Sequence, residues 1–213
     1  MRILATYNIK GGVGKTATAV NLAYLAARDG ARTLIWDMDP QAAATFYFRI
    51  RPRVKGGSKK LIKGKLDVDR LIRATDFPEL DLLPADFTYR RMDQHLERAS
   101  NSTVRLAQLL QPLAEEYDVL FLDCAPSISL VSEAVFVASD ALLVPTIPTT
   151  LSLRTLDQLV GHLGRRKGRR PQLLPFFCMV DRRKSLHRRI TADPVRGSTP
   201  LLRSTIPYAS VVE

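Results

Sequence analysis

The stretch Lys10-Gly11-Gly12-Val13-Gly14-Lys15-Thr16 decides the fold. It follows an apolar run at residues 3–7, typical of a buried strand, and precedes residues 16–29, where apolar residues recur at helical spacing. Glycines let the backbone turn its N–H groups toward phosphate oxygens, and the start of a helix adds partial positive charge. This order predicts a phosphate-binding loop, in which Lys15 meets the β- and γ-phosphates and Thr16 binds Mg²⁺.

Apolar runs alternate with helix-length segments along the rest of the chain. We expect strands at residues 33–36, 80–83, 119–122, 141–144, 173–180 and 201–206, and helices at residues 103–116, 130–139 and 153–163. Strands that are apolar throughout and separated by helices are typical of a mostly parallel sheet covered on both faces. The sequence therefore predicts an α/β, doubly wound fold of the P-loop NTPase type, with helices flanking the sheet.

Composition favours one soluble domain over residues 1–213, since 213 residues with 46% hydrophobic content fit a single core. No apolar run approaches the roughly 20 residues of a membrane span, and Met1 leads directly into a strand, so we expect a cytoplasmic protein. Cys124 and Cys178 are too few for a disulfide framework or a cysteine-based zinc site. Both lie in apolar runs, which predicts buried free thiols without a function.

The chain is basic, with 32 Lys and Arg against 21 Asp and Glu, a net charge of +11. Residues 49–65 hold eight basic residues and no acidic one, and residues 162–189 hold ten against the single acid Asp181. Such clusters favour polyanions as partners, although a solvated basic face is the alternative for each. Because residues 49–65 also contain Pro52 and three glycines, we expect an exposed loop there.

The phosphate loop departs from the standard pattern, because Ile9 stands where the first glycine is expected and an extra lysine, Lys10, follows it. This variant resembles the deviant Walker A motif of the ParA/MinD family of dimerising ATPases. Three further stretches are similar to that family: Asp37-Met38-Asp39-Pro40-Gln41, Val119-Leu120-Phe121-Leu122-Asp123 and Leu142-Leu143-Val144-Pro145. The resemblance covers nearly the whole chain, and the Asp-x-Asp-Pro-Gln stretch is typical of the ParA branch.

Hydrolysis of ATP requires a metal that bridges phosphates, a group that orients water, and cations that neutralise developing charge. We expect Asp123 to be exposed at the end of its strand and to hold Mg²⁺ through a water, with a buried structural role as the alternative. The resemblance implies that Asp39 orients the water beside the metal. It also implies that Asp37 supports the metal shell, unless it caps a helix, and that Lys10 reaches the partner's nucleotide in a homodimer, unless it contacts phosphate in its own chain.

The remaining predicted contacts concern the nucleotide and DNA. The resemblance implies that ATP or ADP lies against Gly11, Gly12, Val13, Gly14, Lys15, Thr16 and Ala17, with Met179, Asp181 and Pro207 near the adenine. In ParA-like proteins, basic residues late in the chain bind DNA of any sequence, which here implies Arg182, Arg183, Lys184, Arg188 and Arg189. These residues favour duplex over single-stranded DNA, because no aromatic side chain among them offers a stacking platform. The sequence does not choose between this cluster and residues 49–65.

The leading hypothesis is a ParA-like switch in which an ATP-bound homodimer binds nucleoid DNA. A ParB-like or other adaptor then stimulates slow hydrolysis and releases the dimer, which positions a plasmid, a chromosome or a protein organelle. A MinD-like membrane regulator would need an amphipathic C-terminal helix, and none is visible before Glu213, where family members usually continue into further helices. An ATPase like the nitrogenase iron protein would need cysteines that bridge two subunits. A kinase or amide ligase would gain nothing from the basic clusters.

Overall fold

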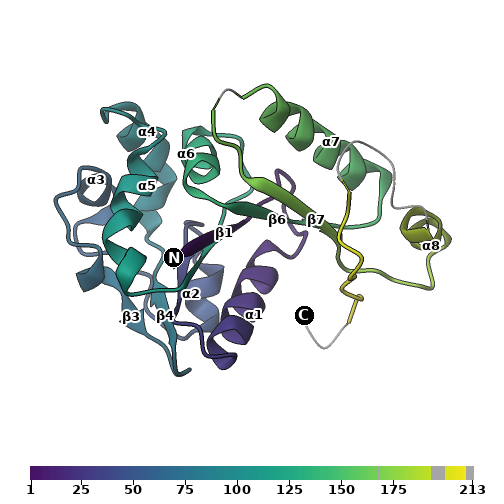
Figure 1. Ribbon diagram of the computed structural model, residues 1–213, viewed down its shortest axis with the longest axis horizontal. Coiled ribbons are helices and arrows are strands. Elements are labelled where there is room, and N and C mark those ends of the chain that lie inside the picture. The colour runs from purple at the N-terminus through teal and green to yellow at the C-terminus, as the bar shows by residue number, and fades with distance from the viewer. Residues whose placement is uncertain (167, 193–199, 210–213) are drawn as a thin grey trace.

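The computed structural model describes residues 1–166, 168–192 and 200–209. Within these residues, strands form one seven-stranded sheet in the order β3-β4-β2-β5-β1-β6-β7 (Figure 1). The strands are β1 (Arg2–Thr6), β2 (Thr33–Asp37), β3 (Arg73–Ala74), β4 (Leu80–Leu83), β5 (Val119–Asp123), β6 (Ala141–Thr146) and β7 (Gln172–Phe177). Neighbouring strands are parallel except β3 and β4, which are antiparallel. The predicted α/β, doubly wound fold is confirmed.

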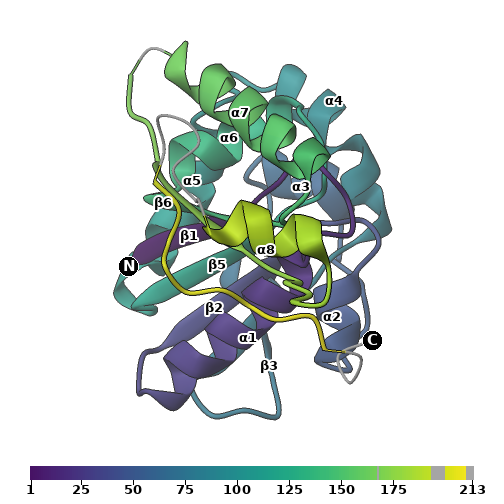
Figure 2. The ribbon, with the colours of Figure 1, turned by 90° about the vertical axis from the view of Figure 1, so that its right-hand side faces the viewer.

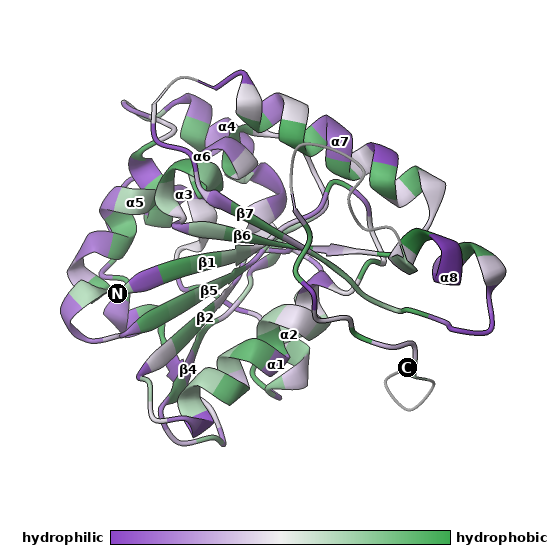
Figure 3. Cartoon of the chain, turned by 45° about the vertical axis from the view of Figure 1, so that its right-hand side comes forward, coloured by the Kyte–Doolittle hydropathy of each residue, from purple (hydrophilic) through white to green (hydrophobic). Residues whose placement is uncertain are grey.

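Helices cover both faces of the sheet. They are α1 (Lys15–Arg28), α2 (Ala43–Tyr47), α3 (Gly57–Ile62), α4 (Met92–Glu97), α5 (Arg105–Leu110), α6 (Leu130–Ala138), α7 (Thr150–Gly164) and α8 (Ser185–Ala192), with the 3₁₀ turns η1 (Asp69–Leu71), η2 (Phe87–Arg91) and η3 (Gln111–Glu115). Along β5, Leu120 and Leu122 join one apolar cluster and Phe121 joins another, because successive strand side chains point to opposite faces. Helices α5, α6 and α7 cover the first face, and α1 and α2 cover the second (Figure 3).

Two predicted elements differ from the structure. The helix expected at residues 103–116 is divided into α5 and η3, because Pro112 has no N–H and disrupts regular helical bonding. Residues 201–206 do not form a strand. Leu202 N and Ile206 N donate to Pro175 O and Phe177 O of β7 at 2.8 and 2.9 Å, so four residues of this segment span two residues of β7 and no continuous ladder forms.

Residues 49–65 were predicted to be an exposed loop, and this prediction was wrong for residues 57–62, which form α3. Helix α3 packs against the body of the protein, with Leu61 and Ile62 fully buried. Ser58 anchors its start, because its backbone N donates to Thr88 Oγ1 and its hydroxyl donates to Thr88 O, each at 2.8 Å. The lysines of the helix remain exposed. This stretch is therefore a packed element with a basic outer face.

The packing of α3 predicts a specific stability difference. Leu61→Ala should lower the free energy of unfolding by about 2–4 kcal/mol, because it removes buried methyl groups and leaves a cavity. The neighbouring exposed substitution Lys60→Ala should change it by less than about 0.5 kcal/mol. Urea unfolding of the three proteins measures both changes, and equal stability of the Leu61→Ala and Lys60→Ala variants would show that α3 is not packed.

Candidate nucleotide-binding site

The carboxyl ends of the central strands meet at one edge of the sheet. In the register of the parallel strands, Asp123 at the end of β5 lies beside Thr6 of β1 and beside Asp37 of β2. The loop from β1 to α1 passes over this edge, since it begins after Thr6 and ends at Lys15. In open α/β sheets, this edge is where ligands bind. The fold therefore brings together residues that are more than 100 positions apart in the sequence.

The loop has a backbone shape that favours glycine. Gly12 and Gly14 have φ angles of +67° and +88°, in the left-handed region that side chains disfavour. Gly14 is also the residue from which α1 begins, and its carbonyl accepts the backbone N–H of Thr18 at 2.9 Å. The start of a helix carries partial positive charge, so the loop and the helix together form a site for an anion.

Asn8 fixes this loop, although no sequence motif marks it as a site residue. Its Oδ1 accepts from Lys10 N at 2.9 Å, and its Nδ2 donates to Pro145 O at 2.9 Å. The side chain is 1% exposed. It therefore ties the phosphate loop to the end of β6, and the only sequence signal was a polar residue between the strand and the glycines.

Lys15 lies beneath the loop. Its side chain is buried, and its Nζ donates to Lys10 O at 3.1 Å. Burial lowers the pKa of Lys15, whereas the nearby Asp123, Cys124 and Asp39 raise it. An ammonium group has three donors. The position inside the curl of the loop suits a contact with a phosphate that lies against the loop's N–H groups.

Asp123 is fully buried, which corrects the expectation that it is exposed. The reason is that β5 lies between β1 and β2, so the strand end is enclosed on both sides. Burial raises the pKa of Asp123 to about 7, and Asp37 and Asp39 add to the rise, whereas Thr16 and Lys15 oppose it. A buried carboxylate with this pKa favours a cation beside it.

The two carboxylate oxygens of Asp123 differ in their hydrogen bonding. Oδ1 accepts from Thr6 Oγ1 at 3.4 Å, whereas within the described residues Oδ2 has no hydrogen-bond partner. This part of the chain also contains no group of three His, Cys, Asp or Glu side chains that would hold a metal by themselves. An unpartnered oxygen near Thr16 fits Mg²⁺, which binds few protein ligands and takes its others from phosphate and water.

Asp37 and Asp39 differ in their surroundings. Asp37 is fully buried, and its Oδ2 accepts from Thr45 N and Oγ1 at 2.8 and 2.7 Å, while its Oδ1 accepts from Asp39 N at 3.2 Å. It therefore holds the first turn of α2 from outside that helix, whose N-cap residue is Ala42. Asp39 is half-buried, and its Oδ1 accepts from Gln41 N at 2.9 Å. Thr45, which had no sequence signal, also accepts from Ala85 N at 2.9 Å and so connects α2 to the segment after β4.

Lys10 does not point into its own loop. Its Nζ lies 3.3 Å from Ser152 Oγ in the first turn of α7, while its backbone carbonyl accepts the Lys15 ammonium. Two other loop residues pack against neighbouring segments. Val13 is fully buried, and its carbonyl accepts from the Cys178 thiol at 2.9 Å, whereas Gly11 lies beside Pro126.

A pocket of about 620 Å³ lies beside the loop, between α1 and the segment after β7. Met179 and Pro207 line it together with Gly14 and Ala17, and its surface is mostly apolar. Asp181 does not line this pocket. It pairs with the Arg183 guanidinium at 3.0 Å, and the hydrogen bonds from Arg183 lower the pKa of Asp181 to about 2. Two of the three residues predicted near the adenine therefore face this pocket.

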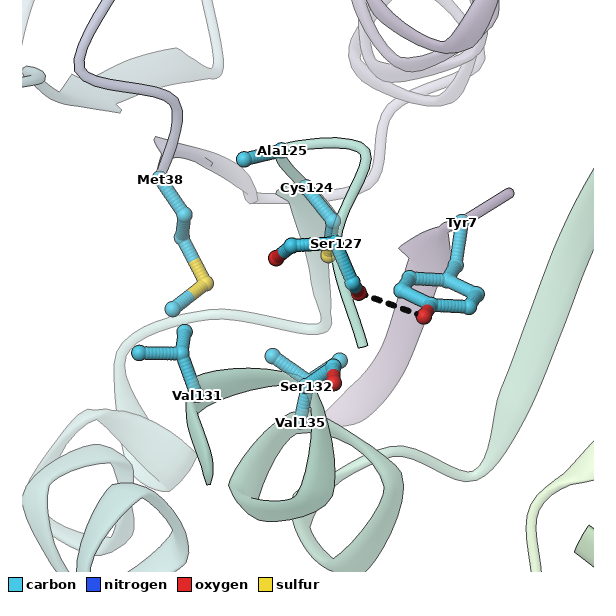
Figure 4. Close-up of a pocket in the computed structure, with 8 residues that line it drawn as sticks. All are labelled: Tyr7, Met38, Cys124, Ala125, Ser127, Val131, Ser132 and Val135. Carbon is cyan, nitrogen blue, oxygen red and sulfur yellow. Dashed lines mark hydrogen bonds between the residues drawn. The ribbon is translucent and has the colours of Figure 1, made fainter. Parts of the chain in front are cut away.

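A second cavity, of about 20 Å³, lies between the loop after β5 and α6 (Figure 4). Tyr7 and Cys124 line it, and the Tyr7 hydroxyl donates to Ser127 O at 2.6 Å. Burial raises the pKa of both groups, so the thiol stays protonated at neutral pH. The cavity is large enough for about one water. Cys124 and Cys178 are both buried free thiols, as predicted.

The basic side chains after β7 lie on and before α8, at one edge of the sheet (Figure 2). All five residues predicted to contact DNA are exposed: Arg182, Arg183, Lys184, Arg188 and Arg189. Arg183 is partly neutralised by its pair with Asp181. The other four form an exposed cluster that we name the α8 surface: Arg182, Lys184, Arg188 and Arg189.

Comparison with known proteins places these features in a family. The family described as AAA domain matches residues 1–173. The chromosome partitioning protein ParA of Myxococcus xanthus is 32% identical over 201 residues, which cover 92% of this chain and 71% of that protein.

Solved structures share the fold and include bound nucleotides. Cobyrinic acid a,c-diamide synthase from Mycobacterium smegmatis, with a bound ATP analogue and magnesium, superposes with a TM-score of 0.88 at 26% identity, over 98% of this chain and 88% of that chain. A putative plasmid partition protein from Borrelia burgdorferi bound to AMPPNP superposes with a TM-score of 0.86 at 23% identity, over 99% of this chain and 86% of that chain.

The burial of Asp123 predicts a pH-dependent stability of the nucleotide-free protein. Its folded pKa of about 7 lies above the ordinary value of 3.8, so the folded protein keeps a proton that the unfolded chain releases between these values. The free energy of unfolding should therefore fall as pH rises through this window. Asp123→Asn should remove this pH-dependent loss of stability and make the protein more stable at about pH 8 by on the order of 4 kcal/mol.

The measurement is urea unfolding of both proteins without nucleotide or magnesium. The two stabilities should converge below about pH 3, where Asp123 is largely protonated in both the folded and the unfolded state of the unsubstituted protein. A stability difference that does not change with pH would contradict the assignment.

Proposed function

This chain belongs to the ParA family of partitioning ATPases, and we propose that it is an ATP-driven switch that binds and releases DNA to position a cargo. The observation that carries this proposal is the buried pair of Lys15 and Asp123 beneath a glycine loop, with one carboxylate oxygen unpartnered among the described residues. A cation and a phosphate together would satisfy both groups. The site is therefore suited to ATP with Mg²⁺ as substrate.

The residues of the loop and its neighbours have different roles in binding the nucleotide. The N–H groups of Gly11 to Lys15 surround the β- and γ-phosphates, and Lys15 neutralises their charge from below. Thr16 and Asp123 hold Mg²⁺, with Asp123 acting through a water. When bound, Mg²⁺ bridges the phosphates and stabilises the charge that develops on them. Met179 and Pro207 contact the adenine in the apolar pocket beside Ala17.

Asp39 orients the attacking water. Its carboxylate is anchored by Gln41 N and lies near enough to Asp123 to raise the pKa of that group. Asp37 stabilises this arrangement. Its carboxylate at the end of β2 accepts hydrogen bonds from Thr45 at the start of α2. A change in the position of Asp39 on hydrolysis is thereby transmitted to α2.

Lys10 acts in the homodimer. Its ammonium lies on Ser152, outside its own phosphate loop, which supports a contact with the nucleotide of the partner subunit. Hydrolysis that needs a cation from a second chain is slow until the dimer is correctly closed. A ParB-like or other adaptor then accelerates hydrolysis by completing this closure.

The dimer binds duplex DNA through the α8 surface. The α8 surface binds the phosphates of duplex DNA of any sequence, so the dimer is retained on the nucleoid until hydrolysis. The cargo is a plasmid, a chromosome or a protein organelle. Within the described part of the chain, no helix has the length and apolar content needed to cross a membrane.

A second candidate function is ATP-dependent amide formation, which the similarity to cobyrinic acid a,c-diamide synthase favours. This candidate gives the exposed basic cluster of the α8 surface no role, which favours the first proposal. Formation of an amide product from ammonia or glutamine with an added carboxylic acid would support this candidate instead.

The role of Asp39 predicts a trapped state. Asp39→Ala should bind ATP normally, stop phosphate release and accumulate dimers, because the water is no longer oriented while the phosphate contacts remain. Asp76→Ala, which removes an exposed carboxylate in the β3–β4 loop, is the matched control and should behave like the unsubstituted protein. Phosphate release and light scattering in ATP measure both properties. An Asp39→Ala protein that stays monomeric in ATP would refute the role.

The α8 surface predicts a separable loss of DNA binding. Arg182→Glu combined with Arg189→Glu should weaken duplex binding about tenfold or more while leaving dimerisation in ATP unchanged. Arg2→Glu with Arg28→Glu makes the same charge change at exposed positions elsewhere and should have little effect. Gel shifts and light scattering measure the two properties. If the α8 variant loses both duplex binding and dimerisation in ATP, these residues belong to the subunit interface instead.

A further inference from the structure

A second basic surface lies on α3 and α4, and the proposed function does not use it. We name it the α3 surface; its members are Lys55, Lys59, Lys60, Lys63, Arg91 and Arg98, all of them exposed. The contact of Ser58 Oγ with His95 Nδ1 at 3.0 Å joins the two helices. This packing brings basic side chains from two separate stretches of the sequence close to His95.

His95 shows that these charges lie close together. Its pKa is lowered first by burial and then by Lys59, Arg98, Arg91 and Lys63, which oppose a further positive charge. Four positively charged side chains, from α3, η2 and the two helix ends, therefore lower the pKa of one imidazole. Such a concentration of like charge is unfavourable for the isolated protein, and a polyanion would relieve it.

The cations of this surface are free to contact a ligand. Within the described residues, no carboxylate forms an ion pair with any of the six side chains. The α8 surface differs, because Arg183 beside it is held by Asp181. Phosphates approaching the α3 surface would thus not compete with internal ion pairs.

The two basic surfaces lie at opposite edges of the sheet. Helix α8 follows β7, the last strand at one edge, whereas α3 lies on the side of β4 and β3 at the other edge. Figure 1 shows α3 at the left end and α8 at the right end of the molecule. Seven strands at about 4.8 Å spacing separate the edges by roughly 30 Å. The two surfaces therefore face different directions.

We propose that the α3 surface binds the phosphate backbone of a second DNA duplex, so that one chain contacts two duplex segments, one at each edge of the sheet. The binding of the α3 surface stands on its own residues, and only the pairing of two duplexes rests on the proposed function. The expected binding is independent of sequence and weakens as salt rises, because it depends on the release of counterions from phosphates.

Other polyanions fit the α3 surface less well. A helix that binds an anionic membrane presents apolar residues to the lipid, but Leu61 and Ile62 of α3 are fully buried. Single-stranded nucleic acid requires exposed rings for stacking, and residues 49–65 contain none. Phe87, an exposed ring in η2, is covered by the Arg90 guanidinium at 4.0 Å from its centroid.

The first test is a bridging assay without nucleotide, on protein shown to be monomeric by light scattering. Beads that carry one duplex should capture a second, fluorescent duplex of unrelated sequence when the protein is added. Lys59→Glu with Lys63→Glu should reduce this capture about tenfold or more and keep binding to the beads, whereas the control Arg2→Glu with Arg28→Glu should capture normally. Equal capture by the α3 variant and the control would overturn the proposal.

The second test uses the three histidines as reporters, since His95 lies beside the α3 surface, His187 is in α8, and His162 of α7 contacts Glu133 of α6. In NMR titrations, added duplex should raise the pKa of His95 and leave His162 unchanged, also in the protein that carries Arg182→Glu and Arg189→Glu. A response of His187 alone would overturn the proposal, as would a stronger response of His95 to polyglutamate or phosphatidylserine vesicles than to duplex DNA.

The two proposals fail in different ways. If the α8 variant bridges two duplexes as well as the unsubstituted protein does, the DNA contact in the proposed function is wrong, while the response of His95 still supports the α3 surface. If the α3 variant bridges normally, the further inference is wrong and the ATP-driven switch is unaffected.

Discussion

A carboxylate buried at the end of a central strand is costly unless a cation meets it, and this constraint organises the molecule. Asp123 is enclosed because β5 lies between β1 and β2, and its pKa rises to about 7 as a consequence. Lys15 is buried nearby, where its own pKa falls. Asp123 Oδ2 has no partner among the described residues, which supports the proposal that a ligand carrying both a metal and phosphates completes the site.

Polar side chains hold the loops around this pair. Asn8 joins the phosphate loop to the end of β6, and Asp37 joins the end of β2 to α2 through Thr45. Each of these bonds connects an apolar strand to a segment that contacts or surrounds the ligand. The central strands thus determine where the nucleotide binds, and the edges of the sheet remain available for the basic surfaces.

Sequence reasoning predicted what is local and missed what depends on distant neighbours. The glycines of the loop and the apolar strands were predictable, because left-handed backbone and continuous burial leave local patterns in the sequence. The burial of Asp123 was not, since it follows from which strands flank β5. Thr45 was missed because its partners, Asp37 and Ala85, lie 8 and 40 residues away. Helix α3 was missed because its glycines and lysines resemble those of a loop, while only Leu61 and Ile62 indicate packing.

The central claim is that ATP binding at this site controls an assembly that holds DNA. The most direct measurement is binding to random-sequence duplex without nucleotide, with ADP and with ATP, at low and high salt, with light scattering of the same samples. The account predicts dimers only in ATP, the tightest duplex binding in that state, and release of the duplex at high salt. Dimers in ATP that bind duplex no better than the ADP state would contradict it.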